Sequence, residues 1–172
     1  MKIYLIGMPG SGKTTLGKAL AQGRGDRFID LDVEIVKNAG KGISDIFREE
    51  GEQAFRQMES DILRDATMAY DSFVMSTGGG APCFHDNLDF MKASGITLYL
   101  KVSAPELESR LKQDKDSRPL LADSGNLIQK INDLLFKRES FYNMASFTIE
   151  SDSISLLDLE TAILKVKPHG KH

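Results

Sequence analysis

The sequence predicts an α/β fold in which a parallel sheet carries helices on both faces. Short apolar runs alternate with longer segments of helical periodicity along the chain, which is typical of sheets built from strand–helix–strand units. A glycine-rich turn at residues 7–14 joins the first apolar run to the first helical one, as in a phosphate-binding loop. With 172 residues, 41% of them hydrophobic, residues 1–172 are expected to form one domain.

Each predicted strand is a short apolar run bounded by turn-forming or polar residues. The five runs cover residues 2–6, 27–32, 72–76, 96–102 and 146–150. Because a helical segment separates each run from the next, the strands are expected to lie parallel in one sheet.

Helices are predicted where apolar residues recur at intervals of three and four. Residues 53–68 form such a segment, and the residues on its apolar face are Phe55, Met58, Ile62, Leu63 and Ala66. Residues 15–22 form a helical run after the glycine-rich turn, residues 155–166 form a last amphipathic helix, and residues 167–172 are expected to be a solvated tail. Ser103 with Pro105 and Glu106 forms a capping box, which predicts that a helix carrying residues 108–113 begins there.

Residues 114–126 lack apolar periodicity although they lie between two helical patterns. They contain Asp-Lys-Asp-Ser, Pro119 and a Ser-Gly pair. This composition favours a mobile surface loop.

Charge and composition exclude several classes of protein. The net charge is -3, without the basic surplus typical of nucleic-acid binders, so no nucleic-acid partner is expected. The single cysteine, Cys83, excludes an internal disulfide framework. No apolar stretch reaches the roughly 20 residues of a membrane span, and the N-terminal apolar run is too short for a signal peptide. The cytoplasm is the expected compartment, and nothing in the sequence requires an oligomer, so a monomer is expected.

The turn at residues 7–14, Gly-Met-Pro-Gly-Ser-Gly-Lys-Thr, matches the pattern G-x-x-x-x-G-K-S/T. Its small residues let backbone N–H groups close around phosphate oxygens, and the following helix directs its positive end at the anion. We expect Lys13, on a solvent-facing loop, to bind the β- and γ-phosphates of ATP and Thr14 to bind Mg²⁺. The candidate ATP-binding residues of the loop are Gly10, Ser11, Gly12, Lys13, Thr14 and Thr15. GTPase switches, ATPase motors and small kinases all share such a loop, so the loop alone does not identify the acceptor.

Asp30 and Asp32 are predicted to lie at the end of the second strand, two residues apart and therefore on one face. Ligands of open α/β sheets bind beyond the carboxyl ends of the strands, where both carboxylates would project. One is suited to support the water shell of the metal and the other to orient an attacking hydroxyl.

Together with four further motifs, the phosphate loop and the Asp30–Asp32 pair make the chain resemble the shikimate kinase family, and all six motifs occur in the family's order. The loop at residues 7–15 resembles its Walker A motif, and Asp30-Leu-Asp32 its Asp-x-Asp motif. Residues 51–59 resemble its G-E-x-x-F-R-x-x-E helix. They are followed by the glycines at 78–80, by Arg-Pro-Leu-Leu at 118–121 and by an R-x-x-x-Y stretch within residues 137–142. The Ile-Glu pair that is common in the family after the second aspartate is not matched here, since Val36 follows Ile35.

The resemblance implies the nucleoside monophosphate kinase fold, with sheet order 2-3-1-4-5, and transfer of the ATP γ-phosphoryl group to the 3-hydroxyl of shikimate with Mg²⁺ as cofactor. It implies a substrate-binding helical region at about residues 33–62 and a lid at about residues 114–126. The positions that match shikimate-binding residues are Asp32, Arg56, Gly78, Gly79, Gly80 and Arg138. On the nucleotide side the matching positions are Arg118 in the lid, Arg110 over the adenine and, in a loosely matched segment, Ser155.

Elementary chemistry agrees with these assignments. Arg56 and Arg138, from separate helices, suit the shikimate carboxylate, because charge-assisted hydrogen bonds from guanidinium to carboxylate are strong. Glu59 is expected to fix Arg56 from the same helix face. Lys13, Asp32 and Arg118 are the candidate catalytic residues, and Asp30 is expected to bind the metal through water. A gluconate or nucleoside monophosphate kinase and a nucleotide-dependent regulatory module are the alternatives.

Overall fold

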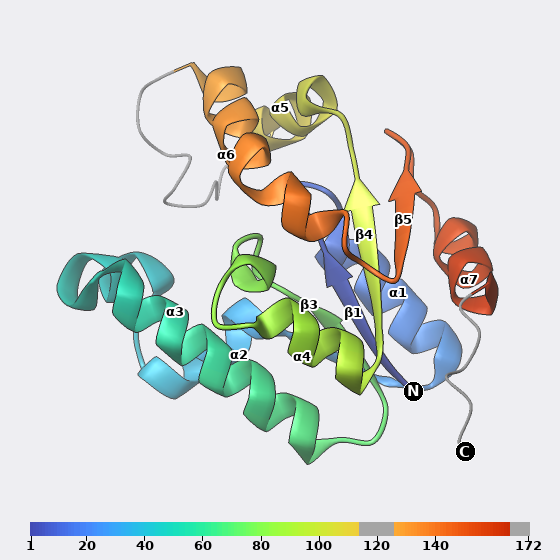
Figure 1. The fold of residues 1–172 in the computed structure, drawn as a ribbon, viewed down its shortest axis with the longest axis horizontal. Helices are drawn as coiled ribbons and strands as arrows, with labels where there is room; N and C mark the ends of the chain where they lie inside the picture. The colour runs from blue at the N-terminus through green and yellow to red at the C-terminus, as the bar shows by residue number, and fades with distance from the viewer. Residues whose placement is uncertain (114–125, 166–172) are drawn as a thin grey trace.

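The computed structural model describes residues 1–113 and 126–165 (Figure 1). Arg118, the predicted lid except for its last residue, and the predicted C-terminal tail therefore lie outside the described residues.

A five-stranded parallel sheet forms the centre of the molecule, in the order β2-β3-β1-β4-β5. Its strands are β1 (Lys2–Ile6), β2 (Arg27–Asp30), β3 (Phe73–Ser76), β4 (Ile96–Lys101) and β5 (Phe147–Glu150). The predicted fold class and strand order are therefore confirmed, and the carboxyl ends of all strands lie at one edge of the sheet.

The helices follow the strands in alternation, as the sequence pattern predicts. They are α1 (Lys13–Arg24), α2 (Leu31–Ala39), α3 (Ile43–Ala69), the 3₁₀ turn η1 (Ala81–Cys83), α4 (Asn87–Ser94), α5 (Ala104–Gln113), α6 (Leu127–Tyr142) and α7 (Leu156–Lys165). The helices α1 and α7 pack on one face of the sheet, and α3 and α4 cover the other (Figure 1).

Alternation along the strands divides the core between these two layers. In β1, Ile3 and Leu5 join the cluster with α1 and α7, whereas Tyr4 and Ile6 join the cluster on the opposite face. All four side chains are 0% exposed. Burial on both faces explains why the strands have continuous apolar runs.

The second strand is shorter than predicted, and this corrects the placement of Asp32. The strand ends at Asp30, whose side chain accepts hydrogen bonds from the backbone N–H groups of Asp32, at 3.1 Å, and Val33, at 3.4 Å. Asp30 is thus the N-cap of α2, a position where aspartate is favoured. Asp32 lies in the first turn of that helix, so the prediction that both carboxylates share one strand face was wrong.

The helix predicted at residues 53–68 is the second part of the longer α3. Gly51 interrupts α3 with φ 86° and ψ 170°, a conformation that is open essentially to glycine alone. Before this break, Lys41 pairs with Glu49 at 2.8 Å and with Glu50 at 2.6 Å. The chain from α2 to Gly51 therefore forms a small helical unit beside the second part of α3.

The predicted capping box at Ser103 forms only in part. Ser103 Oγ accepts a hydrogen bond from the Glu106 N–H at 3.4 Å, as expected of an N-cap. Its own N–H, however, donates to Asp152 at 2.8 Å, and Glu106 binds Arg110 instead. The start of α5 is thereby tied to the turn that follows β5.

Candidate active site

The glycine-rich turn connects β1 to α1 at the carboxyl edge of the sheet. Gly12 is the N-cap of α1, with φ 94° and ψ 9°, a left-handed conformation that favours glycine. Lys13, predicted to sit on a solvent-facing loop, instead begins the helix and is only 4% exposed. Its ammonium donates to the carbonyl oxygens of Gly7, at 2.8 Å, and Met8, at 2.9 Å. The lysine therefore folds back over the loop and is held at its centre.

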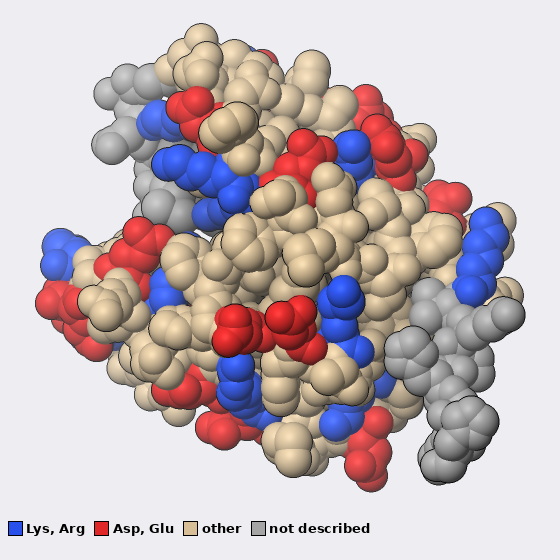
Figure 2. All heavy atoms as spheres, viewed as in Figure 1, with Lys and Arg blue, Asp and Glu red and all other residues tan. Residues whose placement is uncertain are grey.

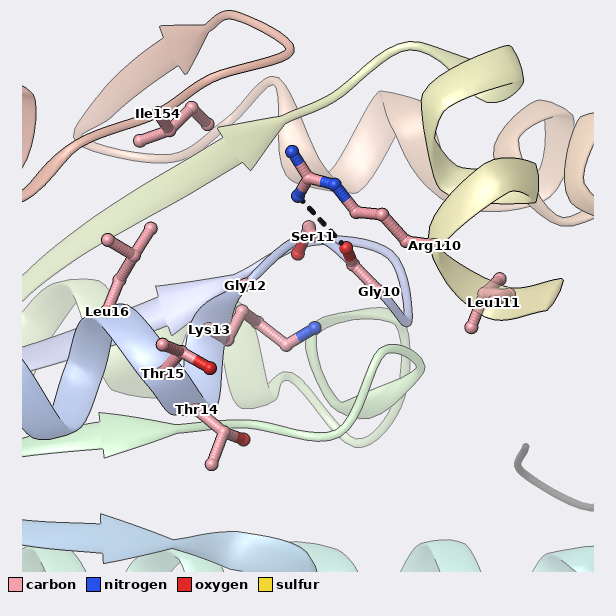
Figure 3. Close-up of a pocket in the computed structure, with 10 residues that line it drawn as sticks. All are labelled: Gly10, Ser11, Gly12, Lys13, Thr14, Thr15, Leu16, Arg110, Leu111 and Ile154. Carbon is pink, nitrogen blue, oxygen red and sulfur yellow. Dashed lines mark hydrogen bonds between the residues drawn. The ribbon is translucent and has the colours of Figure 1, made fainter. Parts of the chain in front are cut away.

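A pocket of about 480 Å³ opens above this turn, and we call it the phosphate-loop pocket (Figure 3). Its lining residues come from the turn, α1, α5 and the segment before α7, and they are Gly10, Ser11, Gly12, Lys13, Thr14, Thr15, Leu16, Arg110, Leu111 and Ile154. The predicted loop residues therefore all lie together. The N-terminus of α1 faces the pocket, which makes it suitable for an anion.

Arg110 spans one side of the phosphate-loop pocket (Figure 3). Its guanidinium donates to the Gly10 carbonyl at 3.2 Å, to the Asp152 carbonyl at 2.6 Å and to the Glu106 carboxylate at 2.7 Å. These contacts link α5 to the phosphate loop and to the turn after β5. Arg110 is therefore placed where a group bound beside the loop would meet it.

Ser155, the residue predicted to bind ATP from a loosely matched segment, lies at the start of α7. Its hydroxyl and its backbone N–H both bind the Asp158 carboxylate, at 2.7 and 2.8 Å, which caps the start of α7. The preceding residue, Ile154, lines the pocket. An apolar side chain at this point was not predicted, because the isolated isoleucine belongs to no sequence pattern.

The Thr14 hydroxyl, in the first turn of α1, contacts the Asp30 carboxylate at the end of β2. Thr14 Oγ1 donates to Asp30 Oδ2 at 3.2 Å and lies 3.2 Å from the hydroxyl of Ser76, a residue that belongs to none of the sequence motifs. A hydroxyl and a carboxylate next to a phosphate site suit Mg²⁺, which binds few protein ligands and completes its shell with phosphate oxygens and water. Residues 1–113 and 126–165 hold no group of three or more His, Cys, Asp and Glu residues able to bind a metal. The donor set therefore fits a phosphate-bound Mg²⁺ and not an all-protein metal site.

The glycines after β3 lie against the two predicted arginines. A Cβ atom on Gly80 would stand 2.5 Å from Arg56 Nη2, and one on Gly79 would stand 3.0 Å from Arg138 Nη1. Only glycine allows backbone and guanidinium to approach this closely. The structure thus brings Arg56 of α3 and Arg138 of α6 to one loop, as predicted.

Arg56 and Arg138 are buried cations, with exposures of 4% and 7%. Arg56 pairs with Glu59 at 2.8 Å, as its position three residues earlier on the helix predicts, and its guanidinium lies 4.5 Å from the centre of the Phe84 ring. Buried charges are costly unless they are paired or bind a charged ligand. This glycine and arginine group, which we call the acceptor site, is therefore suited to an anion.

Gly78 separates two carboxyl groups in the acceptor site. A Cβ atom there would stand 2.6 Å from Glu59 Oε1 and 3.2 Å from Asp32 Oδ1. Glu59 is 0% exposed, and burial raises the pKa of its carboxyl, a change that Arg56 opposes. Asp32 thus reaches the acceptor site from α2, although not from the strand on which it was predicted.

Cys83 lies beside the same arginines, in η1. Burial raises the pKa of its thiol to about 11, although Arg138 and Arg56 act in the opposite direction. The thiol is therefore protonated at neutral pH and contributes no negative charge to the acceptor site.

Figure 2 shows the molecule hollowed between the end formed by α6 and the end formed by α3, with Lys and Arg side chains along the hollow. The acceptor site takes Arg56 from α3 and Arg138 from α6, so it lies between these two ends. The phosphate loop follows β1, next to β3 in the sheet, so the two sites adjoin at the carboxyl edge.

Comparison with known proteins identifies the family. The shikimate kinase family model matches residues 9–166. The shikimate kinase of Parabacteroides distasonis is 43% identical over 171 residues, which cover 96% of this chain and 98% of that protein.

Solved structures agree with the sequence comparison. The crystal structure of shikimate kinase from Bacteroides thetaiotaomicron superposes with a TM-score of 0.87 at 37% identity, covering 96% of each chain. The shikimate kinase of Acinetobacter baumannii, solved in complex with shikimate, gives a TM-score of 0.86 at 40% identity, covering 96% of this chain and 91% of the other. This chain therefore belongs to the shikimate kinase family.

Proposed function

We propose that this protein is a shikimate kinase that transfers the γ-phosphoryl group of ATP to the 3-hydroxyl of shikimate. Besides its family, the observation that supports this most strongly is the pair of buried arginines, Arg56 and Arg138, against the Gly79–Gly80 backbone. Shikimate carries one carboxylate, and two guanidinium groups from separate helices suit its binding by charge-assisted hydrogen bonds.

The roles on the acceptor side follow from this placement. With its carboxylate on the arginines, shikimate turns its hydroxyl groups towards Asp32 and the phosphate loop. Asp32 then orients the 3-hydroxyl and accepts its proton as the oxygen attacks the γ-phosphorus. The bond from that phosphorus to the β,γ-bridging oxygen breaks, and ADP leaves with the charge of that oxygen.

The phosphate loop supplies alignment and positive charge. Lys13 binds the β- and γ-phosphates after its ammonium leaves the Gly7 and Met8 carbonyl oxygens, while the backbone N–H groups hold the remaining phosphate oxygens. Arg110 lies over the adenine, and Arg118, outside the described residues, is assigned to the nucleotide phosphates as the lid cation.

Mg²⁺ is the cofactor that the donor set fits. Thr14 Oγ1 is its proposed direct ligand, and Asp30 is proposed to hold one of its waters. A bound Mg²⁺ neutralises charge on the phosphate oxygens. Asp30 lies between Thr14 and the start of α2. It therefore supports both the proposed metal ligand and the helix that carries Asp32.

We propose the cytoplasm as the compartment, because the reaction consumes ATP. That the protein is a monomer remains a prediction. No helix within residues 1–113 and 126–165 is long and apolar enough to cross a membrane.

The acceptor is tested by ADP release with MgATP and shikimate, gluconate or each nucleoside monophosphate in turn. We expect release to depend on shikimate alone. A rate without shikimate that equals the rate with it would contradict the kinase assignment, and stimulation by gluconate alone would change the acceptor.

Arg56→Ala is expected to raise the KM for shikimate by about 10- to 100-fold, because a charged hydrogen bond contributes about 1.5–3 kcal/mol. The KM for ATP should change little, since Arg56 lies outside the phosphate-loop pocket. Steady-state kinetics with each substrate varied in turn measure both constants. Equal weakening of both substrates would indicate a structural role.

Gly80→Ala is expected to raise the KM for shikimate by a smaller factor, about fivefold, which corresponds to about 1 kcal/mol. The added methyl group would lie 2.5 Å from Arg56 Nη2 and must displace the end of that flexible side chain. Gly23→Ala is the matched control, because a Cβ at Gly23 meets nothing within 4 Å. An equal effect in both variants would exclude displacement of Arg56 as the cause.

A further inference from the structure

Tyr142 has no role in the function proposed above, yet it joins three parts of the site. We propose that Tyr142 is a positioning residue whose hydroxyl fixes the Gly79–Gly80 peptide and Arg138 in the arrangement that receives the carboxylate of the acceptor. This inference rests on the proposed function and extends it to a residue outside the direct contacts.

The contacts of Tyr142 carry the inference. It is the last residue of α6, four residues after Arg138 and so on the same helix face. The side chain is 0% exposed, and its ring centre lies 4.9 Å from that of Tyr99. Its hydroxyl donates to the Gly79 carbonyl oxygen at 2.5 Å and lies 3.8 Å from the sulfur of Met8 in the phosphate loop.

Arg138 lies beside the peptide that this hydroxyl binds, because its Nη1 would stand 3.0 Å from a Cβ atom on Gly79. Since the proton of Tyr142 goes to the Gly79 carbonyl, the phenol oxygen presents only its lone pairs to this guanidinium, which can only donate. Burial raises the pKa of this hydroxyl above its usual range, so it keeps the proton at any working pH. One neutral hydroxyl therefore holds the carbonyl group in place beside the cation.

The glycine loop needs such an anchor. Glycine restricts φ and ψ least of all residues, so three consecutive glycines do not fix their own peptide planes. Because the peptide is planar and trans, a Gly79 carbonyl that points at Tyr142 directs the Gly80 N–H to the opposite side. A flipped peptide would lose the hydrogen bond to Tyr142 and would exchange its N–H and carbonyl oxygen between the two sides, next to Arg138 and Arg56. Tyr142 thus holds this peptide in one orientation beside the two arginines.

The test compares Tyr142→Phe with Tyr4→Phe. Tyr4 is also 0% exposed, and its hydroxyl is 3.0 Å from Thr67 Oγ1. Thr67 lies eleven residues after Arg56 on α3, about 16 Å along the helix axis. Both variants lose one buried hydroxyl, so both are expected to lower the temperature of thermal unfolding.

Only Tyr142→Phe is expected to change acceptor binding. Its KM for shikimate should rise about tenfold, equivalent to about 1.4 kcal/mol, while the KM for MgATP and kcat stay within about twofold of the wild type. Tyr4→Phe should leave all three constants unchanged. If the role of Tyr142 were purely structural, its loss would not raise the KM for shikimate while leaving the KM for MgATP unchanged.

The outcomes are distinguishable. An active wild type with an unchanged shikimate KM in Tyr142→Phe, or an equal rise in Tyr4→Phe, would overturn the role of Tyr142 alone. A wild type without shikimate-dependent ADP release would overturn the proposed function and this inference with it. If Tyr142→Phe unfolds below the assay temperature, the wild type and both variants are assayed below the unfolding temperature of Tyr142→Phe. The shikimate KM should again rise in Tyr142→Phe alone, and equal values in all three proteins would overturn the role.

Discussion

Asp32→Asn is expected to lower kcat by about 10²- to 10⁴-fold, the usual span for a positioned acid–base group. The substitution keeps the shape of the side chain but removes the charge that we propose orients the attacking hydroxyl and accepts its proton. ATP binding should survive, because Lys13 and the loop amides are unchanged. Steady-state kinetics together with direct titration of ATP measure the two effects separately.

Asp30→Asn is the matched control for Asp32→Asn. Asparagine caps helices about as well as aspartate, so α2 should keep its start and its orientation. Activity should fall in a way that rising Mg²⁺ partly restores, because Asp30 is assigned to the water shell of the metal. If Asp32→Asn keeps a near-normal kcat while Asp30→Asn loses activity that Mg²⁺ does not restore, the two roles are exchanged.

Lys13→Met is expected to lower kcat by about 10²- to 10³-fold or more, as for the loss of a preorganised group that stabilises transition-state charge. Since Lys13 also bonds to the Gly7 and Met8 carbonyl oxygens, the variant should lose about 1 kcal/mol of folding stability. Thermal unfolding and ADP release measure these two consequences.

Lys18→Met is the control for a lost lysine on the same helix. Lys18 is exposed, with its ammonium 5.9 Å from the centre of the Phe28 ring, and it does not line the phosphate-loop pocket. Its activity should equal that of the wild type. Full turnover in a folded Lys13→Met variant would remove Lys13 from the mechanism.

The features that the sequence predicted well are those determined by local chemistry. The phosphate loop needs small residues at fixed spacing between a strand and a helix, and the structure has this arrangement between β1 and α1. Arg56 and Glu59 lie one helical turn apart, so their ion pair also follows from the sequence. Their meeting with Arg138 was available only through the family resemblance.

The errors arise where local chemistry is ambiguous. Aspartate is common both after a strand and at the start of a helix, so Asp30-Leu-Asp32 is compatible with either element. The structure has the helix start, because Asp30 accepts hydrogen bonds from the backbone N–H groups of Asp32 and Val33. Lys13 was predicted to sit on a solvent-facing loop, and its burial depends on the path of that loop.

Tyr142 shows a different limit. Its partner, Gly79, is 63 residues away in the chain, and no periodicity or spacing connects an aromatic residue at a helix end to a glycine turn. Such a contact exists only after the sheet has brought β3 and the end of α6 together.

The break at Gly51 divides α3 mechanically into two parts. A continuous helix would transmit any tilt of its first turns to Arg56 through its backbone hydrogen bonds, whereas an interrupted helix bends at the interruption. The unit from α2 to Gly51, held by the pairs of Lys41, is therefore not tied to Arg56 through a continuous helical backbone. Asp32 belongs to this unit and Arg56 to the second part of α3, so the residue proposed to orient the hydroxyl and the residue proposed to bind the carboxylate are carried by two separately braced parts of the fold.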